Sequence, residues 1–128
     1  MKSSVRKEAD MKVEKVTYGI LKTVTDLNGH PYDDWHREHV GIPGMILIFH
    51  SERLDGKFLF FFPYEEWNHL QRHMRTSLGH IMPRDGGFIM HTHNSIYDFD
   101  IDEGCLSNEE KFLLNTFAYR LFAEPDKA

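Results

Sequence analysis

The chain has 128 residues, of which 41% are hydrophobic and 13% aromatic, and it carries a formal net charge of −5. This composition fits one folded domain and excludes a disordered chain. The acidic balance also argues against a general nucleic-acid binder, which needs a basic surface. The single cysteine excludes an intrachain disulfide. Since no apolar run is long enough to span a bilayer, we expect a cytoplasmic protein without a membrane partner.

The first half of the chain predicts strands. Residues 1–11 are polar and are expected to form a flexible N-terminal segment, and a single domain then runs from residue 12 to 128. Residues 13–25 alternate apolar and polar side chains, as a strand does. Two apolar stretches, 45–50 and 57–62, flank the turn residues Asp55 and Gly56 and predict a β-hairpin. The phenylalanine-rich second stretch predicts a strand that is buried on both faces.

The second half of the chain predicts two helices. Apolar residues recur at helical spacing after Pro63, which predicts an amphipathic helix over 64–76. Residues 79–86 are expected to form a loop and 87–93 a strand, and 108–123 a C-terminal helix with a broad apolar face. The order β-β-β-α-β-α predicts an α+β domain: a mostly antiparallel sheet with the mid-chain and C-terminal helices packed on it.

Histidines and carboxylates are concentrated between residues 86 and 110. His91 and His93 stand two apart in the predicted strand 87–93, so both imidazoles point to the same side and can reach one ion. Zinc is bound by such imidazoles together with a carboxylate, here Asp98 or Glu110. The alternative is a strand end with two exposed polar residues.

A second pattern in the same segment is the spacing Asp98-x-Asp100-x-Asp102, with Glu109 eleven positions after Asp98. This is the carboxylate spacing of a calcium-binding loop, although the glycine falls at the seventh position instead of the sixth. The alternatives are a solvated acidic loop, or a strand with its aspartates outward and Tyr97 inward. Calcium is therefore the secondary metal prediction.

The motif that follows can be interpreted in two ways. Ser107-x-x-Glu110 directly before an apolar helix is a capping box, in which the two residues bond each other's backbone. With the histidines, it also resembles the JAB/JAMM metalloprotease pattern over residues 87–111. The resemblance implies zinc on His91, His93 and Glu110, with Ser107 supporting the oxyanion. An upstream glutamate would act as general base, and Glu14 is the candidate.

Two functions follow from these patterns. The first is a non-catalytic binding or regulatory protein, similar in kind to an inhibitor or immunity protein, with a bound divalent metal. Its acidic, histidine-containing loop would contact another protein that has a basic surface. The alternative is a small JAB/JAMM-like zinc-dependent peptidase or isopeptidase, in which zinc-bound water attacks a carbonyl. The expected partner contacts are Tyr97, Asp98, Asp100 and Asp102.

Overall fold

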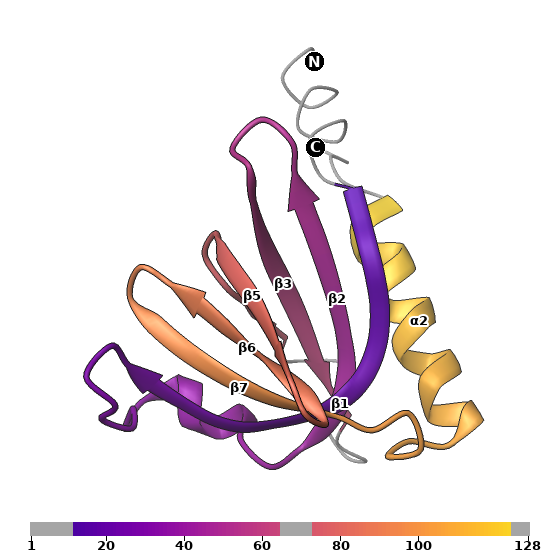
Figure 1. Cartoon of the computed structure of the whole chain (residues 1–128). Coiled ribbons are helices and arrows are strands. Elements are labelled where there is room, and N and C mark those ends of the chain that lie inside the picture. The colour runs from indigo at the N-terminus through magenta and orange to yellow at the C-terminus, as the bar shows by residue number, and fades with distance from the viewer. Residues whose placement is uncertain (1–11, 65–72, 124–128) are drawn as a thin grey trace.

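The structure is a computed structural model that describes residues 12–64 and 73–123. Over these residues it contains seven strands, one 3-10 helix and one α-helix (Figure 1). In chain order the elements are β1 (Lys12–Asp26), η1 (Trp35–His39), β2 (Pro43–Ser51), β3 (Gly56–Pro63), β4 (Met74–Arg75), β5 (Gly79–Arg84), β6 (Gly87–Thr92), β7 (Ser95–Ile101) and α2 (Asn108–Ala123).

Six of these strands form a closed antiparallel barrel. From β1 to β7, leaving out the short β4, each strand pairs with the next along the chain, and β7 returns to pair with β1. The contact between β3 and β5 is a single residue pair, Lys57 with Gly79. The predicted α+β fold is therefore wrong: in the described part of the chain the fold is a β-barrel with one α-helix.

Two element predictions account for this error. Of the helix predicted over 64–76, residues 65–72 lie outside the described residues. Its last part is a strand, because Met74 and Arg75 form β4 opposite Phe61 and Phe60. Met74 is 1% exposed, so burial against β3 overrides its helical phase. The loop predicted over 79–86 is also wrong, because β5 occupies most of it and pairs with β6 from Gly79 to Arg84.

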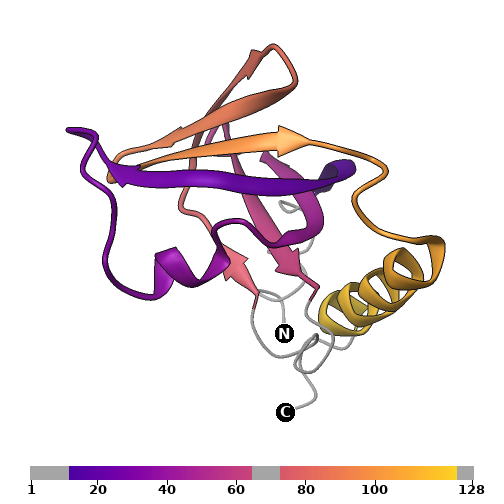
Figure 2. The same ribbon diagram turned by 90° about the horizontal axis from the view of Figure 1, so that it is seen from below.

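β1 is shared by both sides of the barrel. Its first half pairs with β2 and its second half with β7. Figure 2 shows this strand, in indigo, running across the width of the molecule. Two register shifts, at Glu14 and at Lys22, mark bulges that increase the local twist. Between them, Gly19 lies opposite both Gly44 and Ile101. The bulged strand can therefore curve around the barrel.

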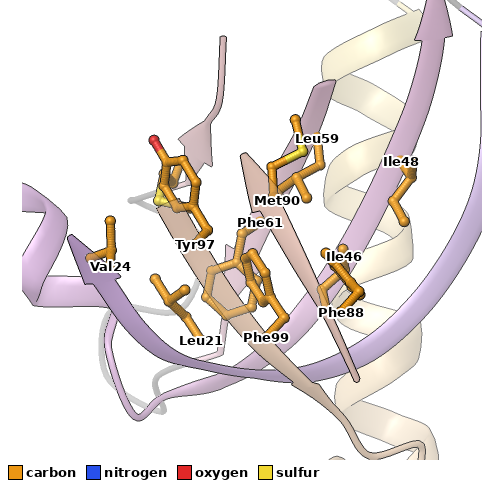
Figure 3. Packing of buried hydrophobic residues seen from close by; sticks show 11 residues of the cluster. Leu21, Val24, Ile46, Ile48, Leu59, Phe61, Phe88, Met90, Tyr97 and Phe99 are labelled. Carbon is orange, nitrogen blue, oxygen red and sulfur yellow. The ribbon is translucent and has the colours of Figure 1, made fainter. Parts of the chain in front are cut away.

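The interior of the barrel is filled by alternate side chains of the strands (Figure 3). The aromatic rings of Phe61 from β3 and Phe99 from β7 meet across it, with centroids 5.5 Å apart. Phe88 stacks on Phe99 at 5.1 Å. The buried residues of this inner core are Leu21, Val24, Ile46, Ile48, Leu59, Phe61, Met74, Phe88, Met90, Tyr97 and Phe99.

A second apolar layer lies outside the barrel, between α2 and the hairpin of β2 and β3. The alternate phenylalanines Phe58, Phe60 and Phe62 face this layer, whereas Leu59 and Phe61 face the interior. Leu114 of α2, which is 0% exposed, packs in the same layer. The predicted strand buried on both faces is thus confirmed, as are the hairpin and the C-terminal helix.

One end of the barrel is covered by the segment between β1 and β2. The aromatic ring of Tyr32 and the side chain of Val40 pack against the inner core. The hydroxyl of Tyr32 is 2.7 Å from Oγ of Ser95 at the start of β7, and Val40 bridges to Leu21 of β1. Because strands alternate in direction, the starts of β1, β3 and β6 lie at the opposite end of the barrel.

Candidate functional site

The predicted histidine pair lies at the end of β6. His91 is exposed on the outer face, between the buried residues Met90 and Thr92, and His93 is exposed in the turn that follows. Directly opposite His91 stands His80 of β5, which is also exposed. The imidazole that the fold places beside His91 is therefore that of His80. Sequence spacing missed it because residues 79–86 were expected to form a loop.

The predicted metal ligands are engaged in separate places. Asp98 accepts hydrogen bonds from Arg84, and Glu110 accepts one from the backbone N–H of Ser107. Within residues 12–64 and 73–123, no three His, Cys, Asp or Glu side chains gather as a metal ion would need. The expected set of His91, His93, Asp98 and Glu110 is thus not assembled by these residues, and zinc or calcium binding stays a prediction.

The acidic segment is largely a strand, β7, with its carboxylates on the outer face. Arg84 of β5 bonds two of them: its Nε lies 2.8 Å from Oδ1 of Asp98, and its terminal nitrogen lies 2.6 Å from Oδ1 of Asp100. This guanidinium lowers the pKa of Asp100. Asp102 is exposed just beyond the strand. Arg84 therefore reduces the negative charge that the acidic segment offers to a partner.

The aromatic contact predicted in this segment is wrong. Tyr97 is 4% exposed and belongs to the inner core, because β7 alternates and its odd-numbered side chains face the interior. Burial also raises the pKa of its hydroxyl. Tyr97 is thus unable to form part of a surface for a protein partner.

Replacing Arg84 by methionine should lower stability most at neutral pH. The folded-state pKa of Asp100 lies below its ordinary value because Arg84 bonds its carboxylate. The stability that this ion pair contributes is therefore present above pH 3.8 and is lost as pH falls through the folded pKa. Urea unfolding at pH 7 and pH 3 measures this loss. The difference in the free energy of unfolding between wild type and Arg84→Met should be smaller at pH 3 than at pH 7. Arg37→Met is the control, because its contact with Asp33 is exposed. An equal difference at both pH values would contradict the assignment.

Ser107 and Glu110 form the predicted capping box. The N–H of Glu110 donates to Oγ of Ser107 at 3.1 Å, and the N–H of Ser107 donates to Oε1 of Glu110 at 2.9 Å. Both side chains are therefore occupied at the N-terminus of α2. This geometry explains the two residues without a role in zinc binding or oxyanion support.

We expect Ser107→Ala to destabilise the protein by about 1 kcal/mol, the usual cost of losing an N-cap side chain. Glu110→Gln should cost less, because the amide oxygen still accepts the N–H of Ser107. Urea unfolding, followed by the circular dichroism signal of the helix, measures the destabilisation of both variants. If Glu110→Gln proved the more damaging change, the capping role would not suffice to explain this residue.

A cavity among the described residues, which sequence reasoning missed, lies at the barrel end away from Tyr32. It has a volume of about 290 Å³ and is partly open to solvent. All six strands of the barrel contribute to its wall, which makes it the mouth of the barrel. The lining residues are Glu14, Lys15, Thr17, Ile48, Lys57, Ile81, Pro83, Gly87, Phe88 and Ile101.

An ion pair spans part of this mouth. The ammonium of Lys57 donates a hydrogen bond to Oε1 of Glu14, and this bond lowers the pKa of the Glu14 carboxyl. Glu14 is the extra residue of the first bulge in β1, between Val13 and Lys15. It lies at the mouth, whereas His91 lies on the outer face of β6. Glu14 is therefore not positioned as a general base for a metal on His91.

Two further polar groups adjoin the mouth. Thr17 is 1% exposed, and its hydroxyl donates a hydrogen bond to Oε2 of Glu103. His50 stands opposite Lys57 in the strand pair, and its Nδ1 is shielded from solvent without a hydrogen-bond partner among the described residues. The mouth thus combines a mainly apolar wall with a few fixed polar groups, which is the usual character of a small-molecule site.

Comparison of the chain with protein-family models, with curated proteins and with solved structures found no significant match. The resemblance to JAB/JAMM metalloproteases therefore stays a prediction. In the described part of the chain, no helix is long and apolar enough to cross a membrane.

Proposed function

We propose that this protein is a non-catalytic binding protein that holds a small, mainly apolar ligand in the mouth of its barrel. The observation that carries the proposal is the cavity of about 290 Å³ to which all six barrel strands contribute. Side chains at such a position are fixed by the sheet, so the site is preformed, as small-molecule sites usually are.

The walls of the cavity support an apolar ligand body. Ile48, Ile81, Phe88 and Ile101 face it from four different strands. Burial of apolar surface contributes about 25 cal/mol per Å², so these walls supply the attraction. The volume equals that of roughly ten liquid water molecules at about 30 Å³ each. A ligand body of about eight to ten carbon atoms fits this space.

The same observations give less support to recognition through the acidic segment. Asp98 and Asp100 are bonded by Arg84, and Tyr97 is buried in the core. Of the predicted contact set, Asp102 is therefore the exposed carboxylate that Arg84 does not bond. The binding function is retained from the sequence prediction, and the site is moved from the acidic segment to the barrel mouth.

The test is the binding of a neutral, naphthylamine-based fluorescent probe. Saturable binding of one probe per protein is expected for the wild type and should be lost in Ile81→Trp, whose indole fills the cavity. Met82→Trp is the matched control, since Met82 is the next residue of β5, is 47% exposed and lies outside the cavity wall. Probe binding that is absent from the wild type, or equal in the two variants, would overturn the proposal.

A further inference from the structure

The charges at the barrel mouth bear on which ligand it accepts. The cavity wall contains three charged side chains: Glu14, Lys15 and Lys57. Glu14 and Lys57 neutralise each other through their hydrogen-bonded ion pair. The wall is therefore left with one uncompensated positive charge, that of Lys15.

Lys15 is held at this position by the barrel. It stands opposite Ile48 in the pairing of β1 with β2, directly after the bulge at Glu14. Ile48 faces the interior, so Lys15 lies on the same inward side of the sheet. Among the described residues, no acidic side chain forms an ion pair with Lys15. Its ammonium is thus available to a ligand.

Two other carboxylates outside the cavity wall already have partners among the described residues. Glu52 lies 3.8 Å from the ammonium of Lys12, and Glu103 accepts the hydroxyl of Thr17. A cationic ligand would have to displace Lys57 from Glu14 and would leave both lysines of the wall uncompensated, which like-charge repulsion disfavours. An anionic ligand requires no such rearrangement.

We propose that the ligand is a small amphipathic anion, with its apolar body between the cavity walls and its carboxylate on the ammonium of Lys15. This inference rests on the proposed binding function and adds the chemical class of the ligand. A hydrogen bond between two charged groups is about twice as strong as a neutral one, so the head group selects among ligands of equal chain length.

The inference is tested by displacement of the neutral probe with three eight-carbon ligands: octanoate, octanol and octylammonium. Octanoate should displace the probe at a concentration about tenfold lower than the other two, as one charge-assisted hydrogen bond predicts. The preference should shrink in 1 M salt, where the screening length falls to about 3 Å.

Two variants assign the effect to one side chain. Lys15→Met should weaken octanoate binding about tenfold and leave octanol unchanged. Lys22→Met is the matched control on the same strand, because Lys22 is exposed and lies outside the cavity wall. Its octanoate affinity should equal that of the wild type.

The two proposals fail in different ways. If the probe binds at the mouth but octanol competes as well as octanoate, or if Lys15→Met keeps the full preference, the ligand class is overturned and the binding function stands. If octylammonium is preferred, Glu14 is the group that selects the ligand and the inference is again overturned. If the probe does not bind the wild type, the proposed function itself fails.

Discussion

Replacing Phe61 by alanine should destabilise the protein by about 3–5 kcal/mol, the usual cost of removing a fully buried aromatic ring. Phe61 is 0% exposed and meets Phe99 in the middle of the barrel. β3 and β7 are not neighbours in the sheet order, so this contact links opposite walls of the barrel. The loss would remove a large part of the about 5–15 kcal/mol that stabilises an ordinary domain. Urea unfolding followed by circular dichroism measures it.

Phe112→Ala is the matched control for this experiment. Phe112 is a phenylalanine of α2 that is 69% exposed. Its removal should change the free energy of unfolding by less than about 0.5 kcal/mol, as for most surface substitutions. If Phe61→Ala and Phe112→Ala unfolded at the same urea concentration, the placement of Phe61 in the core would be refuted.

Gly19→Ala should have the second large effect. A Cβ atom at Gly19 would lie 2.0 Å from the backbone oxygen of Asp100, a contact that only a backbone shift can relieve. Because Gly19 is paired on both sides, with Gly44 and with Ile101, the shift would disturb the two strands that flank β1. We expect a destabilisation at the upper end of the about 1–3 kcal/mol that overpacking costs.

The control for this glycine is Gly104→Ala. The nearest heavy atom to a Cβ at Gly104 is Oδ1 of Asp102 at 3.6 Å, which is an ordinary contact. Thermal unfolding of the two variants should give a clearly lower midpoint for Gly19→Ala and a midpoint near that of the wild type for Gly104→Ala. Equal midpoints would show that β1 and β7 do not approach as closely at this point.

The parts of the fold that sequence could predict are those with strong local signals. The hairpin of β2 and β3 follows from two apolar runs and from Asp55, which adopts the positive φ of 53° that its turn requires. The C-terminal helix follows from its apolar face and from the capping box of Ser107 and Glu110. These signals lie within a few residues of the elements that they specify.

β5 was missed because its sequence resembles a loop. Proline normally interrupts a sheet, since it has no N–H to donate, and it is tolerated on edge strands. β5 pairs with β3 only at Gly79, so Pro83 lies beyond that pairing with one side of the strand free among the described residues. The partial pairing that permits Pro83 is a tertiary property, which the sequence of residues 79–86 does not contain.

The candidate site was missed for a related reason. Glu14 and Lys15 are far from Lys57 in the sequence and the three carry no motif, and they meet only because β1 and β3 both pair with β2. The sequence pattern drew attention to Asp98 and Asp100, which alternate on a strand and bond Arg84. The alternation of Tyr97 and Phe99 with these aspartates was the signal for the strand alternative, and the structure confirms that strand as β7.

The pairing of β7 with β1 also has a consequence for how the chain folds. This pairing joins residues as distant in sequence as Gly19 and Ile101, so the loop-closure entropy is large before the barrel gains its last contacts. Non-local strand pairing of this kind slows folding. Until β7 arrives, the second half of β1 has an unpaired edge, and such edges promote association between chains. Rapid refolding at high protein concentration should therefore favour aggregation, and dilution should favour the closed barrel.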